Sequence, residues 1–242
     1  MRNLEEFNQI HRGECAFVLG SGPSLAFQNL EPLQKHVTIA VNSSYVAMPN
    51  ATYFLSDDHD VANWSFFAEN LRNNISTTVL LYENKLSHVV NWFGGRSVVF
   101  RHRTGYNLTD EYEHDNYKNH ICQARTSLGS AIHVAHIMGC DPIVILGLDC
   151  CRTSDGVRWF WQLLPKTMHP KRLDKYPIDR YKKIRRKNVI SDMDLADILD
   201  YWNIRSDEMK KKCRIINASP VSTIDCFDRM SLDDVFRMYN IT

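Results

Sequence analysis

The sequence predicts an α/β fold: one Rossmann-like, doubly wound and mostly parallel sheet with a lid-like excursion. Short apolar runs rich in β-branched residues recur along the chain, and helical patterns separate several of them. One run, residues 143–146, is apolar throughout, which is typical of a parallel strand buried on both faces. A glycine-rich turn follows the first run directly. Together these features predict strands and helices in alternation.

The strands are expected in the short apolar runs, at residues 15–19, 37–41, 52–55, 78–82, 97–100, 143–146 and 214–217. Apolar residues at helical spacing from Val61 to Leu71 predict a helix after the third strand. Further helices are expected at residues 127–139, 192–202 and 231–236. Ser127 is the expected N-cap of the first of these, and Gly139 its stop.

Two segments do not fit this alternation. Residues 101–119 are polar and loop-like, and residues 153–188 combine tryptophans with a basic run from Lys166 to Lys187. Long excursions from a compact domain are often lids or binding loops. We therefore expect one domain over residues 1–242, with 153–188 as a lid or acceptor-binding insertion. The basic run is either a solvated face or a contact for a polyanionic acceptor or the phosphates of a donor.

Composition excludes some classes of protein. The chain has 29 basic and 28 acidic residues and a net charge of +1, so a nucleic-acid partner is not expected. Its seven cysteines contain no CxxC pair, which predicts reduced structural thiols rather than a zinc site. The sequence contains no signal-peptide core and no stretch of membrane-spanning length. These features predict a cytoplasmic protein without a membrane span.

The turn after the first strand reads Gly20-Ser21-Gly22-Pro23-Ser24. Its glycines permit close approach of a ligand to the main chain. A phosphate there would meet backbone amides and the hydroxyls of Ser21 and Ser24. The same residues also suit a tight turn from strand to helix, and this alternative stays open.

Several polar residues follow other predicted strands. In a parallel sheet the carboxyl ends of the strands share one edge, where ligands bind. Capping or turn formation is the alternative role of each residue alone. The predicted donor or nucleotide site therefore consists of the turn residues Gly20, Ser21, Gly22 and Ser24, with Asn42, Ser43, Arg125, Thr126, Ser127 and Asp149.

Three further residues are candidates for chemistry. Asp57 and Asp58 follow the third strand, and their carboxylates would suit Mg²⁺. Both would equally suit the first turn of a helix, where the dipole favours negative charge. His169 lies in the predicted lid, where a histidine would take a proton from an acceptor hydroxyl.

Three short blocks of the sequence resemble a known superfamily. Residues Val18–Leu25 are similar to the opening of small bacterial lipooligosaccharide sialyltransferases and of archaeal-type hydroxymethyl-dihydropterin diphosphokinases with their flagellin-glycosylation relatives. Residues 125–129, 135–140 and 145–149 resemble the second shared block. Residues 215–220 are closer to the diphosphokinase-like side and to phage-borne relatives.

By position, the resemblance implies that Gly20, Ser21 and Gly22 hold the donor and that Asn42 meets it. It places Ser127 and Asp149 near the nucleotide, and His169 as the general base. The chain also departs from the sialyltransferases. Cys150 and Cys151 stand where those enzymes have tyrosines, and the spacing from Asp149 to His169 is shorter. The departure puts the sialic-acid donor in doubt.

The leading hypothesis is therefore a glycosyltransferase-like enzyme that uses a nucleotide-sugar donor and a glycan or small-alcohol acceptor. The alternative is a diphosphotransferase that moves pyrophosphate from ATP to a small alcohol, with Mg²⁺ bound at Asp57 and Asp58. A third hypothesis is a non-catalytic nucleotide-binding or phage protein. No cofactor other than Mg²⁺ is implied.

Overall fold

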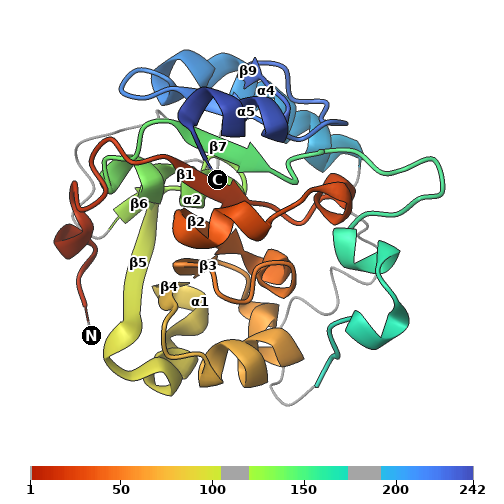
Figure 1. The fold of residues 1–242 in the computed structure, drawn as a ribbon. Helices are drawn as coiled ribbons and strands as arrows, with labels where there is room; N and C mark the ends of the chain where they lie inside the picture. Colours follow the sequence, from red (N-terminus) through yellow and green to blue (C-terminus); the bar gives the residue numbers. More distant parts are fainter. Residues whose placement is uncertain (1, 105–119, 174–191, 242) are drawn as a thin grey trace.

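A parallel sheet of nine strands forms the centre of the molecule (Figure 1). The computed structural model describes residues 2–104, 120–173 and 192–241. The strand order is β6-β5-β4-β3-β2-β1-β7-β8-β9. The strands are β1 (Ala16–Leu19), β2 (Val37–Val41), β3 (Tyr53–Ser56), β4 (Thr78–Tyr82), β5 (Ser97–Thr104), β6 (His120–Cys122), β7 (Ile143–Leu146), β8 (Ile215–Asn217) and β9 (Asp228–Arg229). The predicted α/β class and Rossmann-like sheet are confirmed.

All seven predicted runs form strands, and two strands were not predicted. β6 has three residues and β9 has two, and both β9 residues are exposed. Neither strand carries an apolar run long enough to mark it in the sequence. β5 extends to Thr104, into the segment expected to be a loop. The rest of that segment, residues 105–119, lies outside the described residues.

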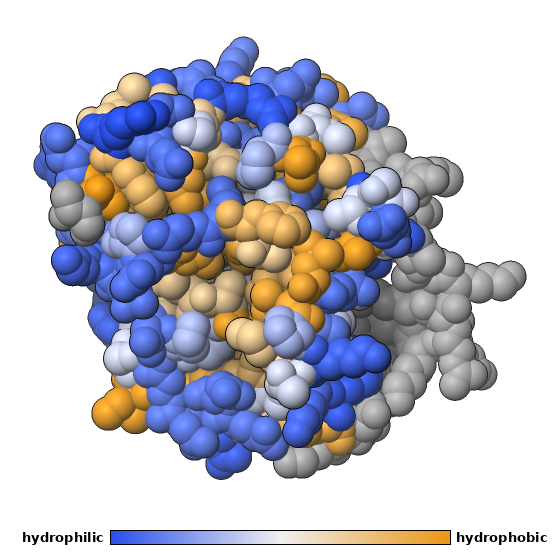
Figure 2. Space-filling model, turned by 45° about the vertical axis from the view of Figure 1, so that its right-hand side comes forward, coloured by the Kyte–Doolittle hydropathy of each residue, from blue (hydrophilic) through white to orange (hydrophobic). Residues whose placement is uncertain are grey.

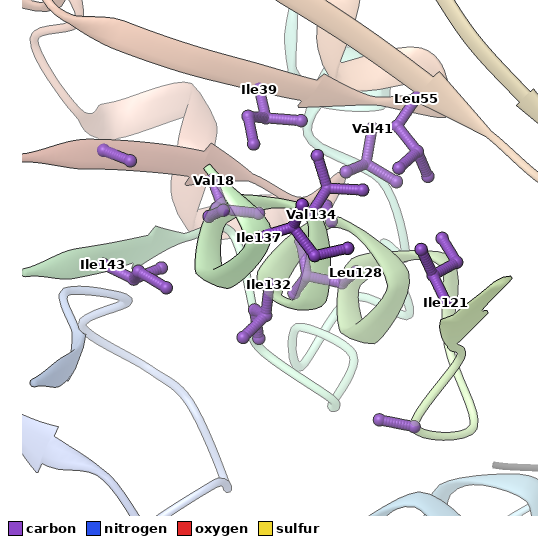
Figure 3. Close-up of a cluster of buried hydrophobic side chains, with 14 of the residues drawn as sticks. Val18, Ile39, Val41, Leu55, Ile121, Leu128, Ile132, Val134, Ile137 and Ile143 are labelled. Atoms are coloured by element: carbon purple, nitrogen blue, oxygen red, sulfur yellow. The ribbon is translucent and has the colours of Figure 1, made fainter. Parts of the chain in front are cut away.

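The two faces of the sheet carry separate hydrophobic cores. Side chains alternate along β1, so that Val18 belongs to one core while Phe17 and Leu19 belong to the other. The Val18 core packs against α2 (Ser127–Ile137), as Figure 3 shows for Ile132, Val134 and Ile137. Helices therefore cover both faces, and every central strand is buried on both.

The other helices are α1 (Glu83–Leu86), α4 (Asp192–Met209) and α5 (Leu232–Tyr239). Ser231, at the start of the predicted helix 231–236, is the N-cap of α5. Gly139, with φ of 79°, follows the C-cap of α2, which supports its role as the stop. The N-cap of α2 is Thr126, however, because the Thr126 hydroxyl accepts the Gly129 amide at 2.9 Å. This shift leaves the hydroxyl of Ser127 available for other contacts.

Many connections are short 3-10 helices. These are Leu4–Phe7, Pro23–Phe27, Glu31–Lys35, Asn42–Val46, His59–Asn63, Ser87–Arg96, Phe160–Leu163 and Lys166–Met168. The single helix expected from Val61 to Leu71 is instead His59–Asn63 followed by a π-helix, Phe66–Leu71. Trp64 between them is extended, because Ser65 donates its amide to the carbonyl of Lys171 at 2.8 Å. A distant segment therefore interrupts the local helical pattern.

Within the described residues, no helix is both long enough and apolar enough to span a membrane. The seven cysteines are all free thiols. The predicted lid, residues 153–188, is described only as far as residue 173, and the remainder of the basic run lies outside the described residues.

Candidate functional site

The strand order reverses at β1, which lies between β2 and β7. In doubly wound sheets, ligands bind beyond the carboxyl ends of the strands at such a switch point. The structure brings the residues predicted to follow β1, β2, β3 and β7 to this edge, together with the start of α2. Figure 2, which brings the right-hand side of Figure 1 forward, shows a band of hydrophobic residues between hydrophilic ones on this side.

The glycines of the first turn allow it to approach the end of β7 closely. Gly20 donates its amide to the carbonyl of Leu146 at 2.7 Å, and Gly22 donates to that of Gly147 at 2.9 Å. A Cβ added to Gly20 or to Gly22 would lie 2.6 Å from the Gly147 oxygen. The two glycines are therefore required by packing at the switch point, where no side chain fits.

Asp149 stabilises the same turn through hydrogen bonds. Its carboxylate, buried at 1% exposure, accepts the Ser24 amide at 2.7 Å and the Ser24 hydroxyl at 2.5 Å. Burial raises the pKa of Asp149, and the two hydrogen bonds from Ser24 oppose this rise. Among the described residues, the amides of Gly20, Gly22 and Ser24 thus already have protein acceptors. The Ser21 amide has none there, which leaves Ser21 as the donor that the turn offers to a ligand.

Ser21 and Ser43 form a hydroxyl pair between the ends of β1 and β2. The Ser43 hydroxyl donates to Ser21 Oγ at 3.0 Å, and the Ser21 hydroxyl donates to the Val41 carbonyl at 3.4 Å. Both residues are partly exposed. The pair presents neutral hydroxyl groups at the edge of the sheet.

Asn42 links this pair to β3 and α2. Its backbone is left-handed, with φ of 52°. In its side chain, Oδ1 accepts a hydrogen bond from the Ser56 hydroxyl at 2.7 Å, and Nδ2 lies 3.4 Å from Ser127 Oγ. The amide is thereby held in one orientation between two strands and a helix. The predicted residues Ser21, Asn42, Ser43 and Ser127 thus form one connected group, called the polar rim below.

Asp57 lies beneath the polar rim as the centre of a buried cluster. It accepts hydrogen bonds from Ser127, from Gln123 at 3.1 Å and from Ser130 at 3.4 Å. The Nε2 atom of His102 lies 3.3 Å from its Oδ2. Burial acts to raise the pKa of Asp57, but the hydrogen bonds and the charge of His102 outweigh burial and lower it. Asp57 is therefore an anion satisfied by the protein itself.

The second carboxylate of the predicted metal pair has another role. Asp58 is the N-cap of the 3-10 helix His59–Asn63 and accepts the Asp60 amide at 3.1 Å. Among the described residues, no cluster of three or more His, Cys, Asp or Glu side chains is arranged to hold a metal ion. A Mg²⁺ ion at Asp57 would have to displace the present donors, so a metal site at Asp57 and Asp58 stays a prediction.

Arg125, Thr126 and Ser127 lead into α2. Arg125 has a left-handed backbone with φ of 68°, and Thr126 caps the helix. Ser127, the first helical residue, contacts both Asn42 and Asp57. Through these contacts Ser127 belongs to the polar rim.

His169 lies on the segment that runs from Phe160 to Leu173. Its Nε2 is 2.9 Å from the carbonyl of Leu164, and its ring meets that of Trp161 edge-on at 5.4 Å. A carbonyl only accepts hydrogen bonds, so Nε2 carries a proton and Nδ1 is the basic atom of the neutral ring. Among the described residues, these contacts do not include the polar rim. Its role as general base stays a prediction.

Several residues of the site carry little signal in the sequence. Ser130 lies one helical turn after Ser127, and that spacing would have found it. Gln123 directly follows the unpredicted strand β6, and His102 lies in the unpredicted end of β5. Gly147 is the counterpart of the glycine turn, but only the register of β1 and β7 shows that the two meet.

Comparison with known proteins places this fold in a family. No protein of curated function matches the sequence significantly. The structure is similar to that of the MAf glycosyltransferase from Magnetospirillum magneticum AMB-1, with a TM-score of 0.57 and 13% identity over 94% of this chain. The chain spans 37% of that protein's length, and likeness at this identity shows the fold alone. The family model described as "6-hydroxymethylpterin diphosphokinase MptE-like" matches residues 1–155, and the chain therefore belongs to the MptE-like family.

Proposed function

We propose that the protein is a glycosyltransferase that binds a nucleotide-activated sugar at the polar rim and transfers the sugar to a hydroxyl acceptor. The rim offers the backbone amide of Ser21 and the side-chain amide of Asn42 as donors, held in place by the hydroxyls of Ser21, Ser43 and Ser127. Such neutral donors suit phosphate oxygens and sugar hydroxyls alike. The fold shared with a MAf glycosyltransferase supports this proposal.

One observation carries the choice of glycosyl over phosphoryl transfer: the Asp57 carboxylate is already engaged by four protein side chains. Phosphoryl transfer from ATP depends on Mg²⁺ held by free carboxylates. Displacement at a sugar carbon has no such requirement when amides and hydroxyls stabilise the departing phosphate. We therefore propose a reaction that proceeds without a metal at Asp57.

In the proposed reaction, Nδ1 of His169 takes the proton of the acceptor hydroxyl as its oxygen bonds to the anomeric carbon. The bond from that carbon to the nucleotide phosphate breaks, and the phosphate leaves with the electron pair. The backbone amide of Ser21 and the second N–H of the Asn42 side chain stabilise the leaving phosphate, while the Ser127 hydroxyl stays on Asp57. The segment carrying His169 would have to bring the histidine to the rim. Within the described residues it is attached at Ser21, which follows β1, and at residues 60–65, which follow β3.

Membership of the MptE-like family favours a second candidate, a diphosphotransferase that uses ATP and Mg²⁺. In that case Asp57 and Asp58 would rearrange around the metal. A panel of CMP, UDP, ADP and ATP, each with Mg²⁺ and with EDTA, separates the two candidates by thermal shift. Saturation to 100 times Kd adds about 2.7 kcal/mol, which corresponds to a rise in Tm of about 5–10 °C for a chain of this length.

We expect CMP or UDP to raise the Tm in EDTA. A shift with ATP that requires Mg²⁺ would favour the diphosphotransferase, and no shift with any nucleotide would exclude both candidates. Asn42→Ala should weaken nucleotide binding by about tenfold, the loss of one hydrogen bond to a charged group. Ser127→Ala should weaken it less, because Ser127 Oγ acts by positioning the Asn42 amide. Ser76→Ala is the matched control, because Ser76 is exposed and precedes β4 at the opposite edge of the sheet.

A further inference from the structure

A cavity lies at the same edge of the sheet as the polar rim, on the other side of the switch point. It has a volume of about 430 Å³ and is lined by the segments 27–29, 217–220 and 229–233. These segments follow the 3-10 helix Pro23–Phe27, strand β8 and strand β9. The buried contact between Ser24 and Asp149, at the junction of β1 and β7, separates the cavity from the polar rim. The cavity is thus distinct from the proposed donor site.

The wall of the cavity combines an aromatic ring with hydrogen-bond acceptors. Phe27 is 77% exposed, which leaves its ring available to a ligand. Gln28 is fixed by its Nε2, which donates to the carbonyl of Ala218 at 2.8 Å. The Oε1 atom of Gln28 is buried and has no hydrogen-bond partner among the described residues. The carboxylate of Asp233 adds another acceptor to the lining. A ligand that brings its own donors would meet these groups.

The charges of the lining favour a neutral ligand. Arg229 donates to the backbone carbonyls of Ser219, Pro220 and Ser222 at 2.9 to 3.3 Å, so its guanidinium supports the loop after β8. Asp233, exposed in the first turn of α5, offsets the remaining positive charge. An anionic ligand such as a phosphate would therefore gain little electrostatic binding energy from the lining.

We propose that this cavity is a saccharide-binding subsite. A pyranose ring has a face of C–H groups that packs on an aromatic ring such as Phe27. Its hydroxyls are donors that suit Gln28 and Asp233. Identification of this saccharide as part of the acceptor rests on the proposed function. The binding itself does not, because the cavity is formed without any nucleotide.

Saturation-transfer NMR of the whole chain without nucleotide tests the subsite, with the neutral methyl glycosides of glucose, galactose, mannose and N-acetylglucosamine as probes. At least one glycoside should receive saturation, and Phe27→Ala and Asp233→Asn should each reduce the signal at least fivefold. Both side chains are exposed, so the variants should fold. Ile75→Ala, at a residue 86% exposed outside the cavity, is the control and should leave the signal unchanged.

No saturation of any glycoside would overturn the subsite, as would binding that survives both cavity variants. Displacement of the glycoside by cytidine or adenosine would also overturn it, because the cavity would then hold a nucleobase. If no saccharide binds in the cavity but nucleotide still binds at the polar rim, the proposed function stands. Saccharide binding without any nucleotide binding would refute only the proposed function.

Discussion

Substitution of Gly22 by alanine tests the structural role of the glycine turn. The added Cβ would lie 2.6 Å from the Gly147 oxygen and 2.7 Å from Cγ and Oδ2 of Asp149. Ordinary contacts between carbon and oxygen begin near about 3.3 Å, so the turn would have to move by about 0.7 Å. Gly22 has φ of −64°, which alanine adopts readily, so any cost is steric rather than conformational.

Overpacking of this kind costs about 1–3 kcal/mol. We expect the upper end, about 3 kcal/mol, because the obstacles are main chain and a buried carboxylate held by Ser24. For a chain of this length that loss lowers the Tm by about 6–12 °C. Urea unfolding and calorimetry of Gly22→Ala measure it directly.

Gly95→Ala is the matched control. A Cβ at Gly95 meets no atom within 4 Å, so its stability should stay within about 1 kcal/mol of the parent protein. A loss below about 0.5 kcal/mol for Gly22→Ala would refute the close packing of the turn against β7. The glycines would then be explained better by a ligand that approaches the main chain.

Three further predictions concern carboxylates. Asp149→Ala should cost about 1–3 kcal/mol in urea unfolding, because it leaves the buried Ser24 amide without an acceptor; an unchanged midpoint would contradict this. The folded-state pKa of Asp57 is lowered, so its stabilisation is present above the unfolded value of about 3.9 and is lost as the pH falls below it. Asp57→Asn should therefore flatten the decline in stability as the pH falls below about 4, and an unaltered pH profile would count against it. Arg172 pairs with Asp60 through two hydrogen bonds of 2.5 and 3.0 Å; a double-mutant cycle should give a coupling of about 1 kcal/mol, and a value near zero would show that the pair is loose in solution.

Much of the fold follows from local signals. Continuous apolar runs mark the strands that are buried on both faces, and β2, β4 and β7 have the predicted bounds. Short edge strands such as β9 cannot be predicted from the sequence, because hydrogen bonds to a neighbouring strand define them and composition does not. The helix expected from Val61 to Leu71 is interrupted at Trp64 by residues more than a hundred positions away, a tertiary effect that no local pattern contains.

The site was predictable to the extent that parallel topology gathers strand ends. Asn42 and Ser127 could be placed on one edge from the sequence, and the structure joins them. The partners of Asp57 could not be foreseen, because Gln123 and His102 reach it from strand ends that lack a pattern of their own. The sequence of the glycine turn suits both a ligand site and a tight turn from strand to helix, and only the structure shows that most of its amides bind protein carbonyl or carboxylate groups.

The position of a bound nucleotide tests the central proposal most directly. A crystal structure of the protein with CMP or UDP in EDTA should show the phosphate beyond the ends of β1 and β2, within hydrogen-bond distance of the Ser21 backbone amide and the Asn42 side-chain amide. The carboxylate of Asp57 should keep its present protein partners. Nucleotide bound only in the cavity beyond β8, or only with Mg²⁺ on Asp57, would contradict a metal-independent donor site at the polar rim.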